Sequence, residues 1–262
     1  MPESKTISIL GCGWLGFPLG EALVADGYNV KGSTTRAEKL SKLRNSGITP
    51  FLLDLNPDSY HSAPFFSSKH LIVNLPPRNR NGIEGFHQKQ LEHVKAAAKK
   101  NGVKKIIFVS STGVYPDSNC EVKEADASLN SLNRSGLSLL ALEENFISSS
   151  FETTIIRFGG LYGPDRNPGN FLEGKKDLGG ADNPVNMIHR DDCIGVIQHI
   201  LKEQLWGYIF NACSPNLPTR QEFYHAAAME IGVKPPSFNG HSKPYKKVNQ
   251  DLLLSKGYSF KH

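Results

Sequence analysis

A glycine-rich hexapeptide near the start of the chain has the spacing of a phosphate-binding turn. It reads Gly11-Cys12-Gly13-Trp14-Leu15-Gly16 and follows the apolar run Thr6–Leu10. In such a strand-to-helix turn, the first glycine permits the bend, the second admits a pyrophosphate and the third allows close helix packing. The amino end of the helix adds N–H groups and positive dipole charge, although a turn without a ligand is the alternative. The residues expected to hold a dinucleotide are Gly11, Gly13, Trp14, Leu15 and Gly16.

The end of the second predicted strand indicates which nicotinamide cofactor fits. An NAD site places Asp or Glu there, about 20 residues after the first glycine, to bind the ribose 2′-hydroxyl. Residues 30–36 (VKGSTTR) contain no carboxylate but offer hydroxyls and an arginine. Since a guanidinium pairs bidentately with phosphate, Ser33, Thr34 and Arg36 predict NADP in preference to NAD. The alternative is that Ser33 or Thr34 caps the next helix and Arg36 is solvated.

A second loop, residues 74–82 (NLPPRNRNG), follows the fourth predicted strand. Ligands of parallel α/β sheets lie beyond the carboxyl ends of the strands, so this loop is expected near the cofactor. The expected cofactor contacts are Asn74, Leu75 and Pro76. Arg78 and Arg80 could bind a phosphate or carboxylate of a substrate, and the alternative is a solvated loop with two surface arginines.

The elements that position these residues alternate between short apolar runs and helix-length amphipathic stretches. Strands are predicted at residues 6–10, 28–32, 50–53, 70–74, 105–110 and 153–158. Helices are predicted at residues 14–25, 36–46, 85–101 and 136–146. Near-continuous apolar strands separated by helices are typical of a parallel sheet covered on both faces. The sequence therefore predicts an α/β protein with a Rossmann-like, doubly wound parallel sheet.

The pattern loosens after Gly159, where glycine and proline crowd residues 159–184. A helix at 191–203, a strand at 208–211, a helix at 219–231 and a linker-like stretch at 235–244 follow. We expect an NAD(P)-binding Rossmann domain over residues 1–160. Residues 161–262 are expected to form a small C-terminal α/β substrate lobe that is partly interleaved with the core.

Composition excludes several classes of protein. The net charge of +5 is small, and the densest basic run, residues 95–105, lacks interleaved aromatics, so we expect no nucleic-acid partner. No apolar run approaches the roughly 20 residues of a membrane span, and the amino terminus lacks a signal peptide. The four cysteines are Cys12, Cys120, Cys193 and Cys213. They lie far apart in the sequence and form no CxxC motif, and this spacing fits neither a disulfide framework nor a zinc site. These features predict a cytoplasmic protein without a metal.

Four further segments occur in a fixed order: residues 110–116 (SSTGVYP), 157–164 (RFGGLYGP), 188–192 (IHRDD) and 210–215 (FNACSP). Over almost the whole chain this series resembles the extended short-chain dehydrogenase/reductases, in the NAD-dependent epimerase/dehydratase group. GCGWLG, LPPRNR and RFGGLYGPDRNPG more narrowly resemble an atypical branch, the YeeZ-like proteins. The resemblance implies an NAD(P)-dependent oxidoreductase or epimerase acting on a nucleotide sugar or a small carbonyl compound. It also implies a homodimer through the helices at 85–101 and 136–146.

The resemblance further implies a Ser/Thr-Tyr-Lys active site, of which this chain has only part. In the family the tyrosine exchanges a proton with the substrate oxygen, and the lysine lowers the tyrosine pKa from near 10. By motif, Ser110 is a cofactor contact and Ser111 takes the Ser/Thr position. Residues 130–144 contain no tyrosine and no lysine; Ser135 and Leu139 stand in the vacant positions. A proton donor must therefore come from elsewhere.

The loop at 159–170 is the family's substrate loop, and Tyr162 is the expected proton donor there, with water as the alternative. Arg166 is expected to bind an anionic substrate group. The alternative is that this segment is only a Gly/Pro turn, in which Tyr162 packs as a structural ring.

His189 and the aspartates after it could suggest metal or acid–base chemistry. No partner stands at ligand spacing, so Asp191 or Asp192 is expected to begin a helix as a cap.

Two functions remain open at this point. The first is an NADP-dependent oxidoreductase or epimerase with an atypical active site, which the cofactor turn and the substrate loops favour. The second is a non-catalytic NADP(H)-binding protein with a redox-sensing or regulatory role, which the missing Tyr-x-x-x-Lys pair favours.

Overall fold

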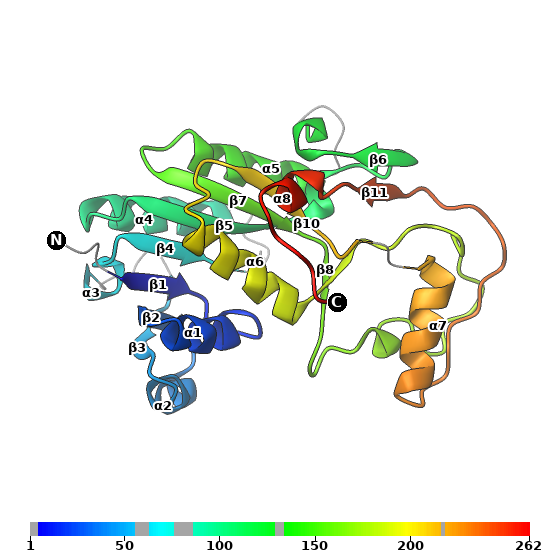
Figure 1. Ribbon diagram of the computed structural model, residues 1–262, viewed down its shortest axis with the longest axis horizontal. Coiled ribbons are helices and arrows are strands. Elements are labelled where there is room, and N and C mark those ends of the chain that lie inside the picture. The colour runs from blue at the N-terminus through cyan, green and yellow to red at the C-terminus, as the bar shows by residue number, and fades with distance from the viewer. Residues whose placement is uncertain (1–4, 56–62, 76–85, 129–133, 216–217) are drawn as a thin grey trace. The chain divides into compact units, whose positions relative to one another are not determined.

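The computed structural model describes residues 5–55, 63–75, 86–128, 134–215 and 218–262 (Figure 1). The chain divides into two compact units, each assembled from three segments. The first unit consists of Met1–Val109, Leu142–Ile155 and Ile200–Tyr208. The second unit consists of Ser110–Ala141, Ile156–His199 and Ile209–His262. The expected division at residue 160 stays a prediction.

A seven-stranded sheet carries the predicted Rossmann topology. Its order is β10-β7-β5-β4-β1-β2-β3, and β1 pairs in parallel with both β2 and β4. Its strands are β1 (Thr6–Leu10), β2 (Asn29–Thr34), β3 (Thr49–Leu52), β4 (His70–Val73), β5 (Lys105–Ser111), β7 (Glu152–Phe158) and β10 (Ile209–Ala212). The chain order reverses between β1 and β4, the switch point where ligands of such sheets bind. The prediction of an α/β Rossmann-like fold is confirmed.

Eight α-helices lie within the described residues. They are α1 (Gly16–Ala25), α2 (Leu40–Asn45), α3 (Ala63–Phe66), α4 (Phe86–Lys100), α5 (Arg134–Ile147), α6 (Arg190–Lys202), α7 (Arg220–Glu230) and α8 (Asp251–Ser255). α1 buries Gly16, Leu19, Gly20 and Leu23, a spacing that places one helix face against β1 and β2. No helix among the described residues is long and apolar enough to span a membrane.

Two small sheets of the second unit were not predicted. β6 (Cys120–Val122) pairs in parallel with β11 (Lys246–Val248), which lies beside it in Figure 1. β8 (Gly160–Tyr162) pairs in parallel with β9 (Met187–His189). Three-residue strands leave almost no periodic signal, and their partners lie far away in the sequence.

A buried arginine organises the polar core of the second unit. The Arg157 guanidinium is almost fully buried, and its Nη1 donates to the Tyr115 hydroxyl at 2.7 Å and to the Glu124 carbonyl at 2.8 Å. The Tyr115 hydroxyl donates to Asn211 Oδ1 at 2.7 Å, and the Asn211 N–H donates to Glu124 Oε1 at 2.9 Å. Burial raises the pKa of Tyr115 to about 12, so the phenol keeps the proton that it donates. The network ties β7 and β10 to the segments before α5.

Tyr115→Phe should lower the free energy of unfolding by about 2 kcal/mol, because Asn211 Oδ1 loses a buried donor and Arg157 loses an acceptor. Urea denaturation measures this loss. The matched control is Tyr245→Phe, a half-buried tyrosine outside the network, which should stay within about 0.5 kcal/mol of wild type. Equal stabilities for the two variants would contradict the role of the network.

Candidate functional site

The glycine turn joins β1 to α1 within the first unit. Gly11 has a φ of +102°, and a Cβ atom on it would lie 2.3 Å from the Asn74 carbonyl oxygen. A Cβ atom on Gly16 would lie 2.2 Å from the Gly11 carbonyl oxygen. Neither position therefore accepts a side chain. At Gly13, by contrast, no heavy atom lies within 4 Å of the Cβ position, so the second glycine borders open space.

Side chains of the two neighbouring strands brace the Gly11 peptide. The Ser33 hydroxyl, after Gly32 in β2, accepts the Gly11 N–H at 2.9 Å. Asn74, which follows β4, donates through Nδ2 to the Gly11 carbonyl oxygen at 3.1 Å. The Cys12 N–H donates to the Ser33 carbonyl at 2.8 Å. The turn is therefore held before any ligand arrives.

The Cys12 thiol faces the protein interior. A Cβ atom on Gly32 would lie 2.7 Å from Cys12 Sγ, which explains a glycine in the middle of β2. Burial raises the pKa of Cys12 to about 12, so the thiol stays protonated. Cys12 is a packing residue and not a nucleophile, and sequence spacing gave no signal of its contact with Gly32.

The amino end of α1 fits an anion. Leu15 precedes the helix without a capping side chain, and the first turn of α1 carries no acidic residue. The positive end of the helix dipole is therefore not offset by the helix's own side chains. Leu15 is buried, whereas Gly13 is exposed. Together with the open space at Gly13, these features fit a dinucleotide pyrophosphate bound by backbone N–H groups.

The three residues predicted to bind a 2′-phosphate, which lie at and just after the end of β2, differ in what they contact. Ser33 is buried and braces Gly11, and Thr34 Oγ1 accepts the Arg36 N–H at 3.2 Å. Arg36 is exposed, and it precedes the 3-10 turn η1 (Ala37–Lys39). Arg36 is thus the member of the set whose side chain reaches solvent. Binding of a 2′-phosphate here stays a prediction.

The loop after β4 is described only in part. Leu75 is half-buried next to Asn74. The predicted residues Pro76, Arg78 and Arg80 lie outside the described residues, and their roles stay predictions.

Ser110 and Ser111 end β5. Ser110 is buried, whereas Ser111 is exposed and its Oγ accepts the Gly113 N–H at 3.1 Å, which caps the 3-10 turn η3 (Thr112–Val114). This contact uses a lone pair of the hydroxyl and leaves its proton for another acceptor. Ser135 and Leu139 stand on α5 where the family has its tyrosine and lysine. Leu139 packs against a hydrophobic cluster that includes Tyr115, and the side chain of Ser135 lies outside the described residues.

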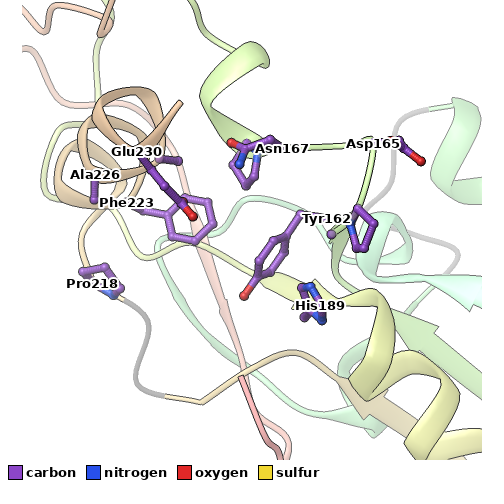
Figure 2. A pocket seen from close by; sticks show the side chains of 12 residues that line it. Tyr162, Asp165, Asn167, His189, Pro218, Phe223, Ala226 and Glu230 are labelled. Atoms are coloured by element: carbon purple, nitrogen blue, oxygen red, sulfur yellow. The ribbon is translucent and has the colours of Figure 1, made fainter. Parts of the chain in front are cut away.

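Tyr162 lies on the wall of a pocket of about 530 Å³ in the second unit (Figure 2). Its ring stands between those of His189 and Phe223, edge-on to both, with centroid distances of 5.2 and 5.8 Å. Burial is the main cause that raises the pKa of Tyr162, followed by the nearby Asp192. The phenol is therefore a hydrogen-bond donor at neutral pH and a weaker acid than free tyrosine.

The rest of this pocket is formed by the loop after β8 and by α7. Asp165 and Asn167 line it, but Arg166 between them does not. Arg166 is exposed, and its backbone closes a turn with Gly163 through two hydrogen bonds of 3.0 and 3.3 Å. Glu230 of α7 adds a second carboxylate to the lining. Anion binding by Arg166 stays a prediction.

Tyr162 should remain protonated throughout the working pH range, because its pKa lies above the ordinary value of about 10. The tyrosinate absorbance of wild type and of Tyr162→Phe, followed by ultraviolet titration, should coincide up to pH about 10. Above that pH the variant should lack the ionisation step that Tyr162 gives in wild type. The thermal midpoint of the variant serves as the folding control. A step below pH about 9 that disappears in Tyr162→Phe would contradict this assignment.

Comparisons with known proteins agree with the geometry of the glycine turn. Residues 11–204 match the family model described as NAD(P)H-binding. Protein YeeZ of Escherichia coli K12 is 36% identical over 241 residues, which cover 89% of this chain and 86% of that protein.

Two solved structures share the fold. UDP-N-acetylglucosamine 4-epimerase from Bacillus cereus matches with a TM-score of 0.78 at 17% identity, covering 98% of this chain and 94% of that one. MoeE5, whose structure is a complex with UDP-glucose and NAD, matches with a TM-score of 0.77 at 16% identity and the same coverage. The resemblance expected from the motifs is confirmed, and the chain belongs to the NAD(P)H-binding family.

Proposed function

We propose that the chain is an NADP-dependent oxidoreductase or epimerase that acts on a nucleotide sugar or a small anionic carbonyl compound. The observation that carries the proposal is the glycine turn. Gly11 and Gly16 have no room for a side chain, whereas Gly13 borders open space at an uncapped helix amino end. This combination suits a bound pyrophosphate.

The preference for NADP rests on the end of β2. Arg36 is exposed there, and residues 30–36 provide no carboxylate for a ribose 2′-hydroxyl. A guanidinium binds a 2′-phosphate through charge-assisted hydrogen bonds. NAD is the alternative cofactor, and MoeE5 supports it because its structure contains NAD.

The catalytic part of the proposal uses two hydroxyl groups of the second unit. The nicotinamide, when bound, would supply or accept hydride. Ser111 would donate its remaining proton in a hydrogen bond to the substrate oxygen. Tyr162 would act as a protonated donor to a substrate in its pocket, since burial keeps its proton in place. With no lysine-assisted tyrosine, water would complete the proton transfer.

The anionic substrate is proposed from the predicted arginines Arg78, Arg80 and Arg166. A guanidinium suits a phosphate or a carboxylate because two parallel N–H groups meet two oxygens. UDP-glucose in the MoeE5 structure supports a nucleotide sugar as the substrate class.

A non-catalytic, NADP(H)-binding regulatory protein is the second candidate. The packing of the half-buried Leu139 against a hydrophobic cluster favours it, because a family lysine would otherwise stand at this position to bind cofactor ribose and lower the tyrosine pKa. The two candidates differ in turnover. Net oxidation of NADPH, or epimerisation of a sugar nucleotide without net change of the cofactor, supports the enzyme, and tight binding without either reaction supports the regulatory protein.

Gly13→Val should weaken NADPH binding by at least about 10-fold while the protein stays folded, because the new side chain enters open space that the pyrophosphate needs. Fluorescence titration of the reduced nicotinamide measures affinity, and circular dichroism with a thermal scan checks folding. Ala25→Val, at the exposed far end of α1, is the matched control and should bind normally. Unchanged affinity in Gly13→Val would overturn the proposed cofactor site.

Arg36→Ala should weaken NADPH binding about 10- to 100-fold and leave NADH binding unchanged, because only NADPH carries the 2′-phosphate. The same titration with both nucleotides gives the ratio directly. Arg44→Ala removes another exposed arginine, on α2, and should change neither affinity. An equal loss for NADH and NADPH, or no loss at all, would refute the NADP assignment.

A further inference from the structure

Three side chains of the second unit gather at the start of α6 without a part in the proposed hydride transfer. His189, Asp191 and His262 each offer one ligand atom, and these three atoms all lie within 4.8 Å of one another. Asp191 Oδ2 lies 3.7 Å from His189 Nδ1 and 3.8 Å from His262 Nε2. Ligands of a tetrahedral zinc ion lie about 3.4 Å apart at the usual bond lengths. Small side-chain rotations therefore bring all three atoms onto one ion.

A fully buried carboxylate holds His262 in this place. Asp192 accepts the Lys261 N–H at 2.8 Å and the His262 N–H at 3.0 Å, and the Tyr258 hydroxyl donates to it at 3.0 Å. A buried charge is costly unless such donors satisfy it. These donors hold the backbone of His262 close to the start of α6, while the side chains of His262 and Asp191 are themselves exposed.

His189 already has the form that a metal requires. Its Nδ1 accepts the Asp191 N–H at 3.2 Å, so this ring nitrogen presents a lone pair and not a proton. The ring packs edge-on against Tyr162, and its centroid lies 4.0 Å from that of His262. A metal at Nδ1 would displace one weak hydrogen bond.

The local charge also suits a cation. The amino end of α6 carries about half a positive charge from the helix dipole, and Arg190 adds one more. Among the three proposed ligands, the Asp191 carboxylate supplies one formal negative charge to the cation, and the two imidazoles supply lone pairs. The acidic residues in the first turn of α6 distinguish this helix start from that of α1, which has none.

We propose that His189, Asp191 and His262 bind one divalent transition-metal ion of the zinc class. Two imidazoles and a carboxylate are borderline donors that suit Zn²⁺ or Co²⁺ and not Mg²⁺. Three protein ligands leave a position for water or a substrate oxygen, as in catalytic zinc sites. His189 also lines the pocket beside Tyr162, so an oxygen bound in that pocket is the natural fourth ligand (Figure 2). The proposal replaces the expectation from sequence that no metal binds.

The test uses the full chain prepared without a histidine tag and stripped with a chelator. Calorimetry with Zn²⁺ should give one site per chain, and Co²⁺ should develop the visible absorption of a four- or five-coordinate ion. His262→Ala should weaken binding at least about 100-fold, since even residues that merely orient ligands contribute 10- to 100-fold. This variant keeps the backbone N–H that Asp192 accepts, so the segment should stay anchored. Asp191→Asn should weaken Zn²⁺ binding in the same way.

His241→Ala is the matched control, because His241 is an exposed histidine of the same unit outside the cluster. His241→Ala should bind Zn²⁺ with the affinity of wild type. Zn²⁺ should raise the thermal midpoint of wild type and of His241→Ala, but not that of His262→Ala. Absence of the site in wild type, or equal affinities in His262→Ala and His241→Ala, would overturn the proposal. NADPH binding is measured separately, so a failed metal site leaves the proposed cofactor site standing.

Discussion

The contact between the Gly11 peptide and the residue after β4 is the constraint on which the cofactor turn depends. β1 and β4 pair in parallel, and their register leads Asn74 directly to Gly11, where no Cβ atom fits. Ser33 from the other side accepts the Gly11 N–H. Because both flanking strands hold this one peptide, α1 begins at a fixed place and presents its uncapped amino end at the topological switch point.

This constraint explains which parts of the fold and site the sequence could predict. β1 was predicted to the residue, and the glycine spacing identified the turn, because both signals are local. The role of Ser33 was not predictable in the same way. A hydroxyl at the end of β2 suits a phosphate, a helix cap or a neighbouring peptide equally well, and only the paired strands select the Gly11 N–H.

The second unit was harder to predict for the same physical reason. β6 and β11 have three residues each and find each other across more than a hundred residues. The Arg157 network and the anchoring of His262 by Asp192 also join distant segments. Neither composition nor periodicity records such pairings. Leu139, which the sequence showed only as a residue in the place of the family lysine, is half-buried and packs against the cluster that contains Tyr115.

The proton chemistry of the second unit follows from what surrounds Tyr162. Family members lower the pKa of a tyrosine with a lysine, whereas burial and Asp192 raise the pKa of Tyr162. A phenol of this kind is a weaker hydrogen-bond donor to a carbonyl oxygen than free tyrosine, and a second electrophile beside it would add to the stabilisation. A divalent ion on the adjacent His189 would provide one, because a Lewis acid stabilises negative charge on oxygen without transferring a proton. A metal-bound oxygen and the protonated Tyr162 would then act on one substrate from neighbouring parts of the same pocket wall. Without the ion, Tyr162 and Ser111 would remain the hydrogen-bond donors available to a substrate oxygen in the second unit.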